Sequence, residues 1–266
     1  VWGGGGGGGG GWWGGAGQRC CVVSGGAGGA ALGAGAVARA TVQSGRCRVL
    51  FLCLGFMALC AIFAVHGLTT PGILVPNLFK EYSGSAVAIS AYLSLAIPAI
   101  FFAASYAPGL ARLESRLPFG PAGWLVLAVV IGVASYAGIA IYRTWLIATL
   151  PLSQPPYSTG LTIFSIALFF FAALRQARSY RRARLVSQAF LLAAFVLLAD
   201  AAAAMVLFET WAAGWWYYHL LMLASVGLAL NALVVERSRA RSLRPEIAAA
   251  LAPDAPEDVE GLPCRC

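Results

Sequence analysis

Six apolar stretches, each long enough or nearly long enough to cross a lipid bilayer, constrain this chain more than any other feature. A transmembrane helix needs about 20 predominantly apolar residues, within a range of about 17–25. The stretches are 49–68, 85–106, 122–142, 159–174, 185–208 and 215–235. Only 11% of the residues are charged, whereas a soluble domain carries about 25%. We therefore predict an all-α integral membrane bundle of six transmembrane helices.

The chain divides into three parts by composition. Residues 1–45 are glycine-rich and include an unbroken glycine run at 3–11. Such a sequence buries too little side-chain surface to offset the entropy of ordering, so we expect it to be disordered. We assign 46–240 to the membrane domain. We expect 241–266 to form a cytoplasmic exit helix and a tail, with "LRPEIAAALA" beginning a helix that has Pro245 at an early position.

The positive charges lie at alternate ends of the apolar stretches. One set of loops and ends holds Arg46, Arg48, Arg112, Arg116, Arg175, Arg178, Arg181, Arg182, Arg184, Arg237, Arg239, Arg241 and Arg244. The opposite loops hold only Lys80 and Arg143. By the positive-inside rule, both termini are cytoplasmic. The net charge of +8 is thus explained by bilayer topology, and we expect no nucleic-acid partner.

Three ionisable residues fall well inside the predicted spans. Counted from the nearest charged residue at the inner face, His66, His219 and Asp200 lie 18, 17 and 16 residues along their helices. With a rise of about 1.5 Å per residue, all three reach about 24–27 Å. This depth is close to the outer edge of a hydrocarbon core about 30 Å thick. We therefore expect both histidines and the carboxylate to lie at one level.

Ionisable groups inside spans are costly and usually mark a site. We predict a ligand-binding site of His66, His219 and Asp200, with Met222 as a further metal ligand on the helix face of His219. The imidazoles could ligate haem iron or bind Cu or Zn. With the carboxylate, an imidazole could instead bind a small polar ligand or respond to protons. The alternative is three separate structural roles. Met222, Cys53 and Cys60 are more often core residues than ligands.

No sequence pattern of an enzyme is present. The chain lacks a Ser/His/Asp order, an H-E-x-x-H motif, a phosphate-binding loop and paired acidic residues of catalytic spacing. We therefore predict that the chain is not an enzyme.

Two segments carry a resemblance to a known class of protein. They are "AVHGLTTPG" (64–72) and "WWYYHLLMLASVGLALNALVVE" (215–236). They resemble the N-terminal multi-span membrane regions of bacterial signalling proteins, in which a nucleotide cyclase, diguanylate cyclase, phosphodiesterase or histidine kinase follows. The resemblance covers about 46–246 and implies that His66 and His219 occupy recurrent positions. It also implies localisation to the bacterial inner membrane and a cytoplasmic output domain that is missing from this chain. It leaves open whether the protein forms a homodimer.

The function expected from these observations is that of a membrane sensor or anchoring module in bacterial signal transduction. The first alternative is a b-type haem or copper protein of electron transfer or metal handling. The second is a small-molecule transporter, for which internal repeats and broken midplane helices would be expected. A structural anchor without a ligand would fit the separate structural roles of the histidines.

Overall fold

The computed structural model describes residues 47–69, 83–107, 121–208 and 213–251. Within these ranges the regular structure is entirely helical. The elements are α2 (Cys47–Thr69), α3 (Ser83–Ala104), α5 (Pro121–Tyr142), α6 (Thr144–Ala148), the 3-10 turn η1 (Pro151–Ser153), α7 (Tyr157–Ala183), α8 (Val186–Leu207) and α9 (Ala213–Leu251). Six of these helices are long and apolar enough to cross a membrane. The predicted all-α bundle of six spans is confirmed, and the chain is a multi-pass membrane protein.

Two helices extend further than the apolar pattern predicted. α7 was expected to end near residue 174, but it continues through the arginine-rich segment to Ala183 and ends where Arg184 adopts the left-handed conformation. α9 continues unbroken past residue 235 and through Pro245, where a separate exit helix was expected. The segment 229–251 contains no glycine and is rich in residues of high helix propensity, so leaving the apolar region does not end the helix.

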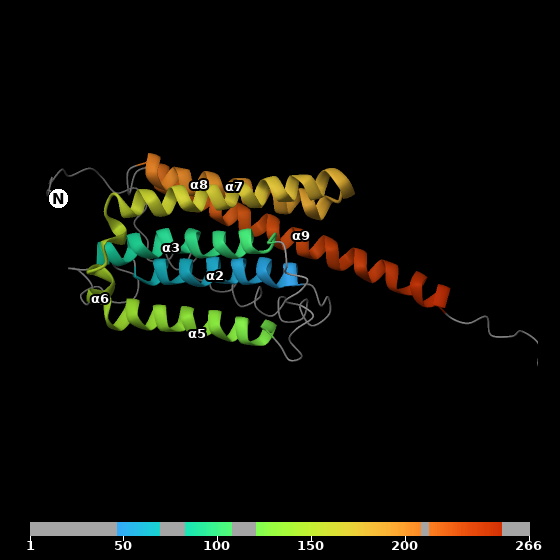
Figure 1. Cartoon of the computed structure of the whole chain (residues 1–266), viewed down its shortest axis with the longest axis horizontal. Coiled ribbons are helices and arrows are strands. Elements are labelled where there is room, and N and C mark those ends of the chain that lie inside the picture. The colour runs from blue at the N-terminus through green and yellow to red at the C-terminus, as the bar shows by residue number, and fades with distance from the viewer. Residues whose placement is uncertain (1–46, 70–82, 108–120, 209–212, 252–266) are drawn as a thin grey trace, which may run out of the picture.

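Five of the helices form an incomplete ring. α2 packs on α3, α3 on α7, α7 on α8, and α8 on α9, and the layers are visible in Figure 1. α5 lies outside this ring, on the far side of α2 and α3 from α7 and α8 (Figure 1). A hydrogen bond of 2.6 Å between the hydroxyls of Ser90 and Tyr136 ties α5 to α3. The ring has one seam, which lies between its first and last helices, α2 and α9.

The core of the ring consists of aromatic side chains packed against small residues. Phe102, Phe169 and Phe195 are fully buried, and the Phe102 ring centroid lies 6.2 and 5.1 Å from the other two. Gly55 on α2 permits this packing, because a Cβ at this position would lie less than 3.0 Å from the Phe102 ring. Small residues that let helices approach closely are typical of membrane bundles.

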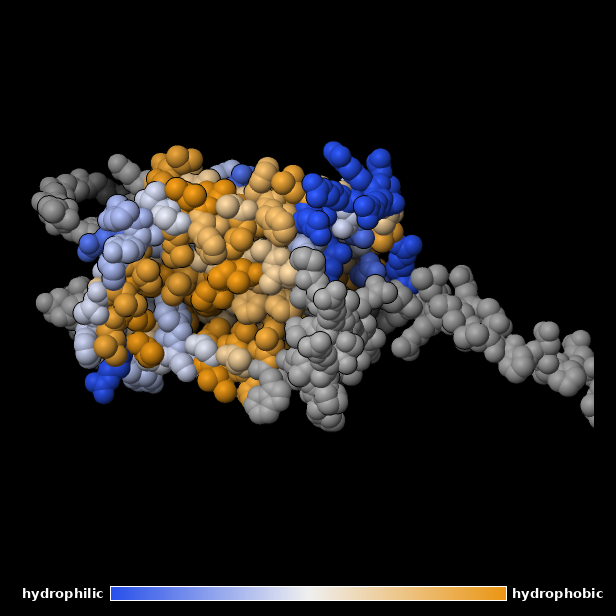
Figure 2. All heavy atoms as spheres, in the orientation of Figure 1, coloured by the Kyte–Doolittle hydropathy of each residue, from blue (hydrophilic) through white to orange (hydrophobic). Residues whose placement is uncertain are grey.

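The surface of the bundle is a wide apolar band. Figure 2 shows hydrophobic side chains around the middle of the molecule and hydrophilic ones at its two ends. Ile131, Ile163 and Leu223 are each more than half exposed, which suits contact with lipid rather than water. We call the end that carries Arg48, Arg175, Arg178, Arg181, Arg182 and Arg184 the arginine-rich end. The assignment of this end to the cytoplasm remains a prediction, and 1–45, Arg46, Lys80, Arg112 and Arg116 lie outside the described residues.

Candidate functional site

The two histidines of the chain lie side by side. The ring centroids of His66 on α2 and His219 on α9 are 5.7 Å apart, with an angle of 43° between the ring planes. His66 is 3% exposed and His219 is 9% exposed. The two imidazoles therefore lie at one level of the bundle, while their depth in a bilayer stays a prediction. The structure adds that they face each other across the seam between α2 and α9, at the end of the bundle opposite the arginine-rich end.

A hydrogen bond from a neighbouring helix holds the His66 ring. Its Nδ1 lies 2.9 Å from the carbonyl oxygen of Val87 on α3. A carbonyl can only accept, so Nδ1 carries the proton, and in the neutral ring the Nε2 lone pair is left as the basic site. Metal-ligating histidines almost always donate their second ring nitrogen in this way, which fixes the tautomer and the ring orientation.

Aromatic rings surround the histidine pair. Phe63, one turn before His66, stacks on that ring at 5.6 Å with an interplanar angle of 12°. The same Phe63 ring lies 5.4 Å from His219. Tyr218 and Trp216 approach His219 at 4.4 and 6.2 Å. These rings restrict the movement of both imidazoles, so the pair is pre-positioned.

The other two predicted ligands differ in their placement. Asp200 lies on the exposed side of α8. Among the described residues, no three His, Cys, Asp or Glu side chains come close enough together to hold a metal ion, so Asp200 does not complete a three-ligand set with the histidines. Met222 is buried in the aromatic core cluster one turn after His219. The structure therefore brings together the two imidazoles of the predicted site without the carboxylate.

The spacing of the two rings suits a single metal ion between them. A ligating imidazole nitrogen lies about 2.0–2.1 Å from Zn, which puts each ring centroid roughly 3 Å from the metal. Two ligating rings are then about 5–6 Å apart, depending on the angle at the metal, and 5.7 Å is observed. Imidazole suits Zn, Cu, Fe and Ni. The pair would supply two ligands and leave the remaining positions to water or an external ligand.

A haem between the same rings fits less well. The macrocycle would have to occupy the plane midway between the two axial imidazoles. Phe63 lies within 5.6 Å of both imidazole centroids and fills part of this slot. A small ion needs no such slot, so the arrangement favours a metal ion over haem.

The seam between α2 and α9 opens toward the arginine-rich end. The two helices meet at the histidines, and nearer that end residues of both line a cavity. A polar network lies at its mouth. Arg48 Nη2 donates to Gln176 Oε1 at 2.6 Å and to the Tyr106 hydroxyl at 3.1 Å, and Ser187 donates to Glu236 at 2.9 Å. These bonds tie α2 to α7 and α8 to α9, but none of them joins α2 directly to α9.

Sequence reasoning missed this network. Gln176 lies in the part of α7 that was expected to be a loop, yet it is completely buried. Burial raises the pKa of Tyr106 above its ordinary value, although the charge of Arg48 opposes the shift. The Tyr106 hydroxyl therefore stays protonated at neutral pH and donates to Gln176 Oε1 at 2.6 Å. The one signal for this network in the sequence was Gln176 itself, an uncharged amide between arginines.

Comparison with known proteins gives no relative: the chain matches no protein-family model, no curated protein and no solved structure.

Proposed function

We propose that the chain is a membrane sensor module in which the histidine pair binds a transition-metal ion of the Zn or Cu type. The observation that carries the proposal is the pairing of His66 and His219 across the seam of the ring. The His66–Val87 hydrogen bond and the ring spacing support metal binding. The resemblance of 64–72 and 215–236 to bacterial signalling proteins supports a role in signal transduction at the bacterial inner membrane.

The proposed response travels along α9. This helix begins beside the histidine pair and continues for 39 residues to Leu251, a length of about 58 Å. A metal that bridges α2 and α9 draws their ends together and so biases the angle between them. Because α9 has no break between His219 and Glu236, its inner part must move with its outer part. A ligand shifts such an equilibrium only by its differential affinity for the two arrangements.

Copper handling is the second candidate, because it uses the same pair of ligands. It differs from sensing in its consequence: a handling protein releases its metal to a partner, whereas a sensor changes the packing of α9. A change in the dynamics of α9 on metal binding separates the two.

Hydrogen–deuterium exchange of the full chain in lipid nanodiscs tests the sensor proposal. Addition of Zn²⁺ or Cu²⁺ is expected to change amide exchange in 226–240, remote from the histidines, by about threefold or more. His66→Gln retains a donor for the Val87 carbonyl but lacks the imidazole ligand, and it should abolish the change. Tyr217→Phe, at an exposed position on the same helix, is the matched control and should respond as the wild type does. An equal response in His66→Gln would overturn the proposal.

A further inference from the structure

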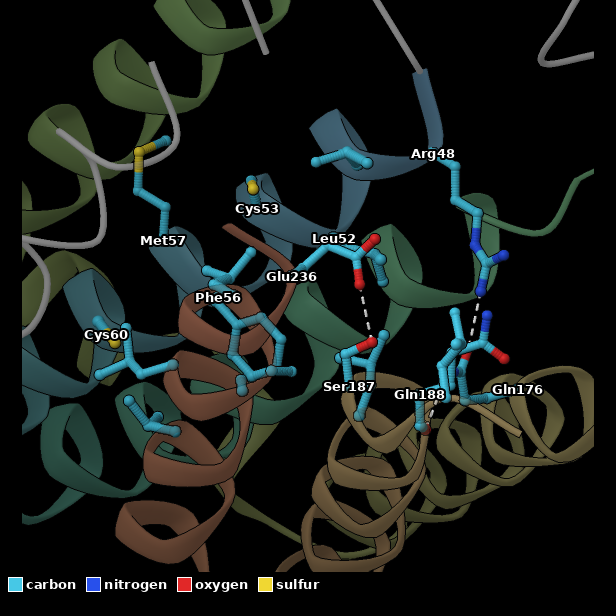
Figure 3. A pocket seen from close by; sticks show the side chains of 18 residues that line it. Arg48, Leu52, Cys53, Phe56, Met57, Cys60, Gln176, Ser187, Gln188 and Glu236 are labelled. Carbon is cyan, nitrogen blue, oxygen red and sulfur yellow. Dashed lines mark hydrogen bonds between the residues drawn. The ribbon is translucent and has the colours of Figure 1, made fainter. Parts of the chain in front are cut away.

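A cavity separates α2 and α9 at the arginine-rich end of the bundle. Its volume is about 250 Å³, and residues of α2, α7, α8 and α9 line it. Figure 3 shows Arg48, Gln176 and Gln188 gathered at one end of the space, with Met57 and Cys60 of α2 toward the other end. The cavity is partly open. It is not the histidine site, because neither imidazole lines it.

The walls of the cavity are apolar along most of its length. Leu52 and Phe56 line it from α2, and Val226, Leu230 and Leu233 line it from α9. A water molecule needs only about 10–15 Å³ of such volume, and an apolar cavity of about 150 Å³ can stay dry and bind benzene. A cavity of this size and lining therefore suits a hydrocarbon group better than water.

The mouth of the cavity carries a positive charge without an acidic partner in the described part of the chain. Arg48 Nη2 bonds only to the neutral oxygens of Gln176 and Tyr106, and the guanidinium lies 4.6 Å from the Tyr106 ring centroid. Arg48 Nε is buried, and no described residue accepts its hydrogen bond. The buried Oε1 of Gln188 has no donor among the described residues either. Glu236, also at the mouth, is exposed and accepts from Ser187.

The mouth lies at the level of lipid headgroups. Arg48 begins one membrane span, Gln188 is near the start of another, and Glu236 ends a third. An amphiphile that enters here places its hydrocarbon between α2 and α9 and its headgroup at Arg48. Guanidinium groups recognise phosphate through charge-assisted, often bidentate hydrogen bonds. A phosphate would give the charge of Arg48 an anionic partner, whereas its hydrogen-bond partners among the described residues are neutral.

We propose that this cavity binds an anionic phospholipid from the leaflet at the arginine-rich end, with one acyl chain between α2 and α9 and the phosphate on Arg48. The bound chain acts as a wedge that holds the inner parts of these two helices apart. The lipid would thus set the packing of α9 from the end opposite the histidine pair. This inference does not depend on metal binding at the pair.

Native mass spectrometry of the full chain in detergent tests the proposal. The delipidated protein is titrated with dioleoyl phosphatidylglycerol, which is anionic, or with dioleoyl phosphatidylcholine, which is zwitterionic. The wild type is expected to bind its first anionic lipid about tenfold more tightly than its first zwitterionic lipid. This factor corresponds to one charge-assisted hydrogen bond. Arg48→Gln should lose this preference, and Arg48→Lys should keep most of it. Arg178→Gln removes an exposed charge from the same end and should leave the preference unchanged.

A second variant tests the cavity itself. Ala229 lines the cavity from α9, and Ala229→Phe fills the space without altering the charge at the mouth. It should weaken the binding of the first lipid of either kind, while circular dichroism and the elution volume report an intact fold. If Arg48→Gln and Arg178→Gln lost the preference for the anionic lipid to the same extent, the proposal would be contradicted. The preference would then come from the general surface charge rather than from Arg48. Wild-type lipid binding by a folded Ala229→Phe variant would also contradict it.

Discussion

The ring of His66 lies 5.7 Å from the ring of His219, although the two residues belong to the first and the last of the six long helices. This contact joins α2 and α9 at one end of their seam. Toward the other end, residues of the same two helices line the cavity behind Arg48.

The close approach of α2 and α3 depends on Gly55. Gly55→Ala should destabilise the protein by about 1–3 kcal/mol, because the added methyl group overlaps the buried Phe102 ring. Thermal unfolding in detergent measures the change. Gly132→Ala is the matched control, since nothing lies within 4 Å of a Cβ at that position. A Gly55→Ala variant as stable as Gly132→Ala would show that the two helices do not approach so closely.

The polar network at the arginine-rich end depends on one amide. Gln176→Leu removes the acceptor of both Arg48 Nη2 and the Tyr106 hydroxyl and should cost about 2 kcal/mol, the penalty for buried donors left without a partner. Chemical or thermal unfolding in detergent gives the value. Gln154→Leu, at an exposed position in the turn before α7, should have no comparable effect. Equal stability of the two variants would exclude a structural role for the network.

The hydroxyl pair between α3 and α5 should contribute a modest coupling energy. A double-mutant cycle with Ser90→Ala and Tyr136→Phe removes the 2.6 Å bond from either side. Hydrogen bonds between membrane helices are typically worth about 0.6 kcal/mol and at most about 1.7 kcal/mol by this method. We expect a coupling energy in this range from unfolding measurements. A value of zero would mean that packing alone holds α5 in place.

Metal binding at the histidine pair should depend on pH. Only a neutral imidazole is a ligand, so protons compete with the metal for each ring. We expect the affinity for Zn²⁺ to fall as the pH is lowered, because protons displace the metal from the ring nitrogens. Isothermal titration calorimetry in buffers of different ionisation enthalpy measures the affinity and the protons released. A pH-independent affinity would show that the metal is bound elsewhere.

The sequence predicted the level at which the site lies better than it predicted which residues form the site. Helix rise is fixed, so residue counts placed His66 and His219 at one level, and the structure adds that their rings meet. Rotation about a helix axis is not fixed by counting. Asp200 was expected at the same level, but it lies on the exposed side of α8, and apolar residues all around a helix give no hint of which side faces inward.

Two other features could not be read from the apolar pattern. Hydropathy marks where a helix leaves the bilayer but not where it ends, so the continuation of α7 to Ala183 and of α9 to Leu251 was missed. The cavity is lined by residues of α2, α7, α8 and α9, which lie far apart in the sequence. It is a property of the tertiary structure alone.

The metal content of the purified full-length chain tests the central claim most directly. Elemental analysis after exposure to Zn²⁺ or Cu²⁺ and removal of excess ion is expected to give about one retained ion per chain that depends on the imidazoles. His66→Gln and His219→Gln should each lose that ion, while Tyr217→Phe should keep it. An absorption spectrum of the same samples tests for haem. Undiminished metal in both histidine variants, or none in the wild type, would contradict the account.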